Sequence, residues 1–220
     1  MQEEQSLRRQ RSRLVQTLRD KGIQDERVLA AIGRVPRHLF IEKGLRARAY
    51  HDEALPIGLK QTISQPFTVA YQTSILDVRP GNRVLEVGTG SGYQAAVLCE
   101  LEAQVFSIER HKPLLERTRA LLDRLGYRVI TKHGDGTRGW AAFAPFDRIV
   151  VTAGAAEIPS PLLEQLRMPA PDVAGGRLII PLGGERGQIM NCIEREGMND
   201  FRRIRLESFR FVPLVGGDGD

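Results

Sequence analysis

The sequence has few of the residues that build disulfide-linked, metal-centred or membrane-spanning folds. Of its 220 residues only two are cysteines, Cys99 and Cys192, and the four histidines are scattered. Two thiols with neither a metal-ligand spacing nor a redox partner are typical of reduced cysteines in a cytosolic protein, so we expect no disulfide and no metal site. No stretch approaches the ~20 consecutive apolar residues of a membrane helix, and the N-terminus lacks a signal-peptide core. We therefore expect a cytoplasmic protein without a membrane partner.

Aromatic residues are scarce as well, at 6% of the chain. The net charge of +5 would suit an acidic or nucleic-acid partner, and much of the excess lies in the arginine-rich segment 8–21. No aromatic side chain interleaves with those arginines to stack on bases, and a solvated helix face explains them. We expect no nucleic-acid partner. The length and the ordinary hydrophobic fraction of 41% predict one globular domain, and we expect a monomer.

Hydrophobic periodicity predicts an N-terminal helical part followed by alternating strands and helices. The N-terminal part is expected to contain helices over 6–21 and from Asp25 to before Pro36, an irregular segment over 36–64 and a helix over 65–77. The second part is expected to contain strands over 83–87, 104–109, 128–132, 146–152 and 177–182, helices over 93–101, 112–125 and 160–167, and a hairpin of strands over 187–195 and 201–212.

This alternation predicts an α/β fold with a doubly wound, mostly parallel, Rossmann-like sheet, N-terminal helices and a C-terminal β-hairpin. We expect a single domain over residues 1–220. Within it, residues 1–80 would form a helical segment on the substrate side and residues 81–220 the cofactor-binding core. Ligands of such sheets bind at the carboxyl ends of the strands, where the strand order reverses.

A glycine-rich turn marks the expected binding site. The strand over 83–87 is followed at once by Gly88, Thr89, Gly90 and Gly92, and then by a helix. Glycine lets the backbone approach a ligand closely, and the helix N-terminus offers unpaired N–H donors. A strand, a glycine turn and a helix in this order are typical of a nucleotide-type site.

Acidic residues around this turn indicate which cofactor it binds. A dinucleotide fingerprint requires glycine at position 93, where Tyr93 stands, and Glu86 would repel a pyrophosphate but suits a ligand with hydroxyls or an ammonium group. Glu109, at the end of the next strand, can accept both hydroxyls of a ribose. Asp135, followed by Gly136, can accept an adenine amino group, although a plain turn also explains it. The pattern resembles the first motif of S-adenosylmethionine-dependent methyltransferases, with these residues and the glycine turn as the cofactor site.

Further segments resemble one methyltransferase family, protein-L-isoaspartate (D-aspartate) O-methyltransferase. They are Thr62-Ile-Ser-Gln-Pro-Phe-Thr-Val-Ala70, Val84–Ala96, His133-Gly-Asp-Gly136, Phe146–Ala153, Gly175–Gly183 and Phe211-Val-Pro-Leu-Val-Gly216. The resemblance covers nearly the whole chain, and the first and last segments make it specific. The sequence departs from the family in a longer turn over 168–174 and in the absence of prolines at 154–156.

The resemblance implies methyl transfer from S-adenosylmethionine to the free α-carboxyl of L-isoaspartyl residues in damaged proteins, and extends to the β-carboxyl of D-aspartyl residues. The acceptor carboxylate is ionised at pH 7, so a strong general base is unnecessary. Ordering the two reactants can lower the barrier by as much as ~7–11 kcal/mol. Ser64 is the expected catalytic residue that orients the carboxylate, with Thr62 and the helix N-terminus near Gln65 as further substrate contacts. On the sequence pattern alone, a helix cap is the better explanation of Ser64, and the catalytic role is what the resemblance implies.

Two other functions remain open on the sequence. The basic N-terminal segment keeps a methyltransferase for RNA or a small molecule in consideration, although no Asn-Pro-Pro-Tyr-like motif follows the fourth strand, where Val-Thr-Ala-Gly-Ala stands. A non-catalytic module that binds the cofactor and recognises isoaspartyl proteins would show cofactor affinity without turnover.

Overall fold

A seven-stranded sheet lies at the centre of the protein. The computed structural model describes residues 2–184 and 186–217; Met1, Glu185 and the end of the C-terminal tail, 218–220, lie outside the described residues. The strand order is β5-β4-β3-β6-β7-β8-β9. The strands are β3 (Arg83–Val87), β4 (Gln104–Glu109), β5 (Val129–His133), β6 (Arg148–Val151), β7 (Arg177–Gly184), β8 (Gly187–Arg195) and β9 (Phe201–Phe209).

Pairing within the sheet is parallel from β5 to β7 and antiparallel from β7 to β9. Neighbouring residues of the central strands enter two separate cores, because successive side chains point to opposite faces of a sheet. Val84 packs into the core that contains α3 and α4, whereas Leu85 packs into the core that contains α6. The expected mostly parallel α/β sheet with a C-terminal hairpin is confirmed.

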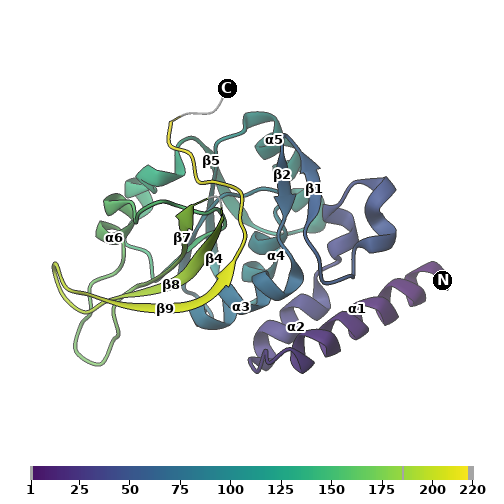
Figure 1. Ribbon diagram of the computed structural model, residues 1–220, viewed down its shortest axis with the longest axis horizontal. Coiled ribbons are helices and arrows are strands. Elements are labelled where there is room, and N and C mark those ends of the chain that lie inside the picture. Colours follow the sequence, from purple (N-terminus) through teal and green to yellow (C-terminus); the bar gives the residue numbers. More distant parts are fainter. Residues whose placement is uncertain (1, 185, 218–220) are drawn as a thin grey trace.

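Helices flank this sheet (Figure 1). They are α1 (Gln2–Asp20), α2 (Glu26–Arg34), α3 (Pro66–Leu76), α4 (Tyr93–Glu100), α5 (Lys112–Leu125) and α6 (Ser160–Glu164). The Asp25 carboxylate caps α2 by accepting the backbone N–H groups of Arg27 and Val28, as expected. Gly126 ends α5 in the left-handed conformation with φ of 80°. Among the helices of the described part of the chain, none is long and apolar enough to cross a membrane.

The segment 36–64 is more regular than its prolines and glycines predict. It contains two 3-10 helices, Arg37–Phe40 and Lys43–Arg48, and an antiparallel pair of strands, β1 (Leu55–Gly58) and β2 (Gln61–Ile63). The expectation of an irregular segment is therefore wrong for these residues. The connection between β1 and β2 places Leu59 and Lys60 at positive φ, a conformation that sequence patterns assign to glycine or asparagine.

A buried arginine holds this segment in place. Arg37 has no exposed surface; its Nε donates to the Ala49 carbonyl at 2.9 Å and its Nη2 to the Glu53 carbonyl at 3.1 Å. The guanidinium also lies over the Tyr93 ring, 4.8 Å from its centroid. Arg37 thereby ties the loop before β1 to the first residue of α4, next to the glycine turn.

The C-terminal tail leaves the sheet earlier than expected and crosses the carboxyl ends of the strands. β9 ends at Phe209, because the backbone beyond it pairs with other partners. The Gly154 N–H donates to the Val212 carbonyl at 2.8 Å, the Leu214 N–H to the Gly154 carbonyl at 2.7 Å, and the Gly217 N–H to Asp135 Oδ2 at 2.8 Å. Figure 1 shows this yellow tail running from β9 across the molecule.

Candidate active site

The glycine turn at the end of β3 adopts a backbone that only glycine enters readily. Gly88, Gly90 and Gly92 have φ of 98°, 52° and 84°. A Cβ on Gly88 would lie 2.4 Å from Thr152 Oγ1, and a Cβ on Gly92 would lie 2.7 Å from Thr118 Cγ2. Gly88 and Gly90 line a cavity, whereas Gly92 faces α5 and is outside the described lining. The structure thus gives Gly92 a role in packing the turn, and its expected cofactor contact stays a prediction.

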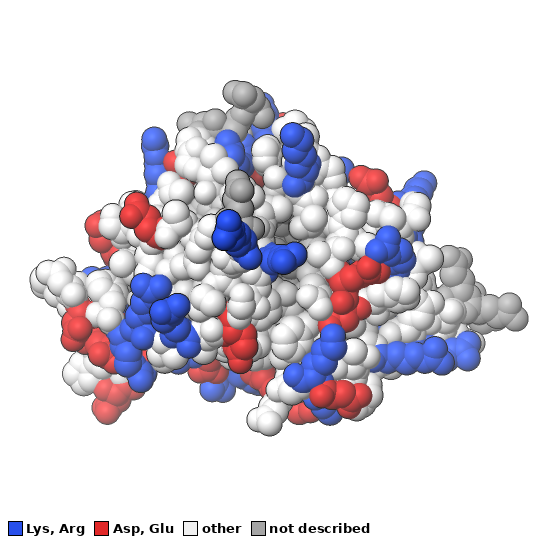
Figure 2. Space-filling view, viewed as in Figure 1, with Lys and Arg blue, Asp and Glu red and all other residues white. Residues whose placement is uncertain are grey.

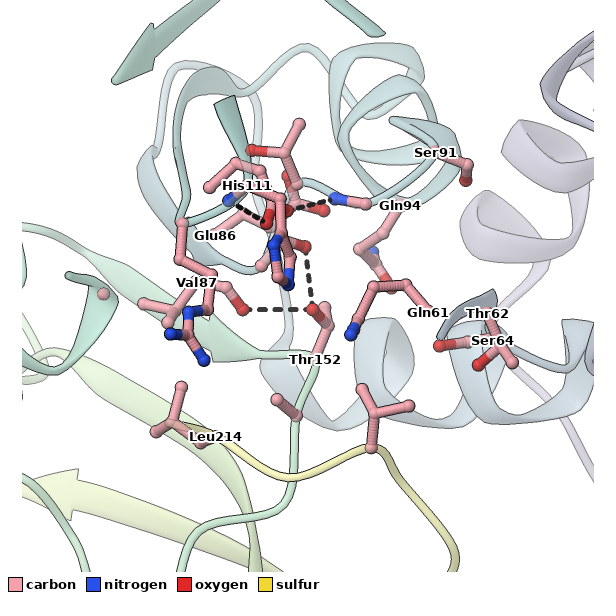
Figure 3. A pocket seen from close by; sticks show the side chains of 18 of the residues that line it. Gln61, Thr62, Ser64, Glu86, Val87, Ser91, Gln94, His111, Thr152 and Leu214 are labelled. Atoms are coloured by element: carbon pink, nitrogen blue, oxygen red, sulfur yellow. Dashed lines mark hydrogen bonds between the residues drawn. The ribbon is translucent and has the colours of Figure 1, made fainter. Parts of the chain in front are cut away.

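Thr152 braces this turn from the end of β6. Its hydroxyl Oγ1 lies 2.8 Å from the Gly88 carbonyl oxygen and 3.0 Å from the Val87 carbonyl oxygen, both of which can accept its hydrogen (Figure 3). Sequence reasoning missed this residue. Its signal was a threonine directly after an apolar strand, Ile-Val-Val-Thr, where parallel strands end together at the ligand edge.

Glu109 is fixed in the cavity by the backbone. Its Oε2 accepts the Gly90 N–H at 2.9 Å, and its Oε1 accepts the His111 N–H at 3.0 Å. The side chain lines the cavity although the residue is only 5% exposed. A carboxylate oxygen can accept more than one hydrogen bond, so both oxygens retain capacity for two neighbouring hydroxyl groups.

Glu86 lies fully buried beneath the turn, among polar side chains of β3 and β4. Ser107 Oγ donates to its Oε2 at 2.5 Å, and Thr89 Oγ1 lies 2.6 Å from the same serine hydroxyl. Burial raises the pKa of Glu86 to about 8, and the hydrogen bond from Ser107 offsets only part of that effect. Sequence reasoning missed Ser107, which is the register partner of Glu86 on the neighbouring strand. Contact between Glu86 and the methionine end of a cofactor remains a prediction.

Asp135 connects the cavity wall to the C-terminal tail. Its Oδ1 accepts the Thr137 N–H at 2.9 Å and the Thr137 hydroxyl at 2.7 Å, and its Oδ2 accepts the Gly217 N–H. Asp135 is not among the described lining residues, whereas Gly136 is, and a Cβ there would lie 2.4 Å from Val87 Cγ1. The structure therefore places Asp135, the expected partner of the adenine, at the cavity edge, with its carboxylate bonded to the tail.

A second cavity adjoins the first, and four residues line both: Thr62, Ser64, Thr152 and Val212. Ser64 lies at this junction with its hydroxyl unbonded within the described residues, and Figure 3 shows Thr62 and Ser64 together at one side of the first cavity. Gln65 lines the second cavity but not the first, and its Nε2 donates to the backbone carbonyl of Asp52 at 3.0 Å.

The helix-cap interpretation of Ser64 does not match this geometry. The N-cap of α3 is Gln65, and no side chain of that residue caps the helix. Asp52 Oδ1 instead accepts the Phe67 N–H at 2.7 Å, which satisfies a donor of the first turn. The hydroxyl of Ser64 therefore remains available for a ligand.

The C-terminal tail supplies a wall that sequence reasoning did not assign to the site. Residues 212–215 line the first cavity, opposite the glycine turn, and Figure 3 labels Leu214 on this wall. The signal was the family-specific segment Phe211-Val-Pro-Leu. The longer turn over 168–174 closes on itself through paired backbone hydrogen bonds of Ala170 and Val173 and lies outside the described lining of both cavities.

The first cavity fits S-adenosylmethionine on the chemistry of its walls. Glycines at positions 88, 90 and 136 keep backbone close to the space, and Glu109, held by two backbone N–H groups, offers carboxylate acceptors of the kind that ribose hydroxyls need. Apolar tail residues line the same cavity as Gly136. Glu86 lines the same cavity, and the expectation that it disfavours a pyrophosphate stays a prediction.

Comparison with known proteins assigns the chain to a family. The family model described as Protein-L-isoaspartate(D-aspartate) O-methyltransferase (PCMT) matches residues 9–219. A protein-L-isoaspartate O-methyltransferase of Salinibacter ruber is 63% identical over 98% of this chain and 96% of its own length. One from Cytophaga hutchinsonii is 51% identical over 95% of this chain and 92% of its own length.

Solved structures agree with this assignment. A protein-L-isoaspartate O-methyltransferase structure has a TM-score of 0.83 at 29% identity and covers 95% of this chain and 67% of that chain. A Plasmodium falciparum protein described as a putative member, in complex with S-adenosyl-L-homocysteine, has a TM-score of 0.79 at 25% identity and covers 93% of this chain and 98% of that chain. The chain thus belongs to the protein-L-isoaspartate (D-aspartate) O-methyltransferase family.

Proposed function

We propose that the chain is an S-adenosylmethionine-dependent protein carboxyl O-methyltransferase that repairs damaged proteins. Its acceptor would be the free α-carboxyl of L-isoaspartyl residues, with the β-carboxyl of D-aspartyl residues as a second acceptor. The observation that carries the proposal is the junction of the two cavities, where Ser64 lines both and its hydroxyl has no hydrogen-bond partner within the described residues. Family membership supports the same acceptor.

The cofactor site consists of the glycine turn with Thr89, the acids Glu86 and Glu109, and the Asp135-Gly136 turn. Glu109 accepts the ribose hydroxyls, and the turn amides border the methionine end. When bound, the cofactor supplies an electrophilic methyl group on a sulfonium. Residues 212–215 cover the cavity and keep water from its interior.

At the junction, Ser64 donates a hydrogen bond to one oxygen of the acceptor carboxylate and leaves the other oxygen free. Thr62 and the α3 N-terminus near Gln65 provide further donors. A hydroxyl suits this task because it orients an anion without adding a competing charge. An ionised carboxylate requires no proton removal, so we assign no general base.

The two parts of the chain divide this work within one domain. The acceptor side, with Thr62, Ser64 and Gln65, comes from residues 1–80, and most of the cofactor side comes from residues 81–220. We further propose a monomeric, cytoplasmic enzyme without a nucleic-acid partner. Among the described residues the large exposed apolar side chains are spread over several loops and strands, and Cys99 and Cys192 are both free thiols.

Labelled S-adenosylmethionine tests this proposal against its alternatives. The enzyme should transfer a base-labile methyl group to aged, isoaspartate-containing protein and none to bulk RNA. Labelling of RNA but not of aged protein would identify a nucleic-acid methyltransferase. Cofactor binding by calorimetry without transfer to either acceptor would identify a non-catalytic binding module. Both outcomes would overturn the proposed function.

A further inference from the structure

The outer part of the second cavity carries two arginines. Arg186 lies just before β8 and Arg210 directly after β9, and both line this cavity but not the first one. Both residues are exposed, and neither forms a hydrogen bond or ion pair within the described part of the chain. Figure 2 shows lysine or arginine side chains close together near the centre of the face that carries β7 to β9, with uncharged surface below them.

No acidic side chain offsets these charges among the described lining residues of the cavity. Asp52, an acid bonded to Gln65 of that wall, already pairs with Lys21 Nζ at 2.6 Å. The remaining wall contains hydroxyl groups and the aromatic rings of Phe67 and Phe209, which stack with centroids 6.4 Å apart. A concave wall with apolar surface strengthens the attraction of a cation for an anion, because water screens it less.

In the proposed function the reacting carboxylate lies at the junction lined by Ser64 and Thr152. Neither Arg186 nor Arg210 belongs to that junction, because neither lines the first cavity. A second anionic group on the acceptor would reach them, since one residue of extended peptide spans roughly 3.3–3.6 Å. On the basis of the proposed function, we propose that Arg186 and Arg210 recognise an acidic side chain within two residues of the isoaspartate and so favour acidic damaged segments.

Three peptides test this inference. Each contains one isoaspartate, and they differ only in one neighbouring residue, which is Glu, Gln or Lys. Separate sets of three place this residue before or after the isoaspartate. The wild-type kcat/KM should follow the order Glu, Gln, Lys at low salt, and the Glu-to-Lys ratio should be roughly tenfold and fall as salt screens the charges. R186Q and R210Q should each reduce that ratio about threefold and leave the rate with the Gln peptide within about twofold.

A matched control separates the cavity from net charge. R13Q removes one charge from an exposed position of α1 outside the lining of both cavities, and it should leave the Glu-to-Lys ratio unchanged. Equal kcat/KM for all three peptides would overturn the inference while the proposed function stands. So would an unchanged Glu-to-Lys ratio in both R186Q and R210Q. Absence of methylation even with the Gln peptide would instead overturn the proposed function.

Discussion

Ser64 is the residue proposed to orient the acceptor carboxylate. It lies where the two cavities meet, its hydroxyl has no partner within the described residues, and Asp52 serves the α3 N-terminus in its place. In the proposed role this hydroxyl acts on the acceptor, so its removal should affect turnover and leave cofactor binding intact.

Replacing Ser64 by alanine should lower kcat about 10²-fold, because a misplaced reactant loses most of the benefit of ordering. The cofactor Kd, measured by calorimetry, should stay within about twofold of wild type. S64T should recover part of the rate. S208A removes another hydroxyl of the second cavity, away from the junction, and should change kcat less than about threefold. Equal losses in S64A and S208A would contradict the assigned role of Ser64.

Glu86 makes stability depend on pH in a defined direction. Its pKa is about 8 in the folded protein against 4.5 for the ordinary group. Between these values the unfolded chain ionises and the folded chain keeps its proton, so stability falls as pH rises, by at most about 1.4 kcal/mol per pH unit. E86Q keeps the shape without the titration.

Urea unfolding of the cofactor-free protein from pH 5 to pH 8 measures this effect. The stability of E86Q relative to wild type should increase steadily across the window and level off above pH 8. A constant difference between the two proteins would show that Glu86 is ionised throughout.

Several site residues depend on sheet register, which the sequence does not display. Ser107 reaches Glu86 because β3 and β4 pair at these two residues, and Thr152 reaches Gly88 because β6 lies on the other side of β3. By contrast, the places of Gly88, Glu109 and Ser64 at the cavities were predictable, since each belongs to a local motif. Gly92 was assigned to the cofactor from the motif, although its space is filled by Thr118 of α5, a contact 26 positions away in sequence.

At the scale of elements, the order of strands and helices from residue 83 onward follows from local patterns. The strand over 83–87 and the helix over 112–125 have the expected bounds, because apolar runs and a terminal glycine define them. The β1–β2 hairpin was not predictable. Its connection uses Leu59 and Lys60 at positive φ, and tertiary packing of Leu55 and Ile57 stabilises it.

The connection from β3 to α4 should be sensitive to an added methyl group at Gly92. G92A forces alanine to φ of 84° and brings its Cβ within 2.7 Å of Thr118 Cγ2, which should cost about 2–4 kcal/mol of unfolding free energy. G44A, in a 3-10 helix with open space around it, should change stability by less than about 0.5 kcal/mol. Urea denaturation measures the unfolding free energy of G92A and G44A. Similar losses in the two variants would contradict the packing role given to Gly92.

At the scale of the whole molecule, the C-terminal tail closes a cavity built by elements far apart in sequence. Deleting residues 213–220 removes the wall formed by Pro213, Leu214 and Val215 and the tie from Gly217 to Asp135. Because these residues are exposed or half-buried, the unfolding midpoint should change little, whereas the cofactor Kd should rise at least about tenfold. L214A should produce a smaller rise. An unchanged Kd in the truncated protein would remove the tail from the cofactor site.

The cavity of the glycine turn adjoins a second cavity, and Ser64 lines both. The proposal that they hold the cofactor and the acceptor depends on the chemistry of the acceptor. The most direct measurement is kcat/KM for two peptides of identical sequence, one with isoaspartate and one with aspartate, using labelled S-adenosylmethionine. We predict efficient methylation of the isoaspartyl peptide and background labelling of its aspartyl twin. Equal labelling of both peptides, or none of the isoaspartyl one, would contradict the account.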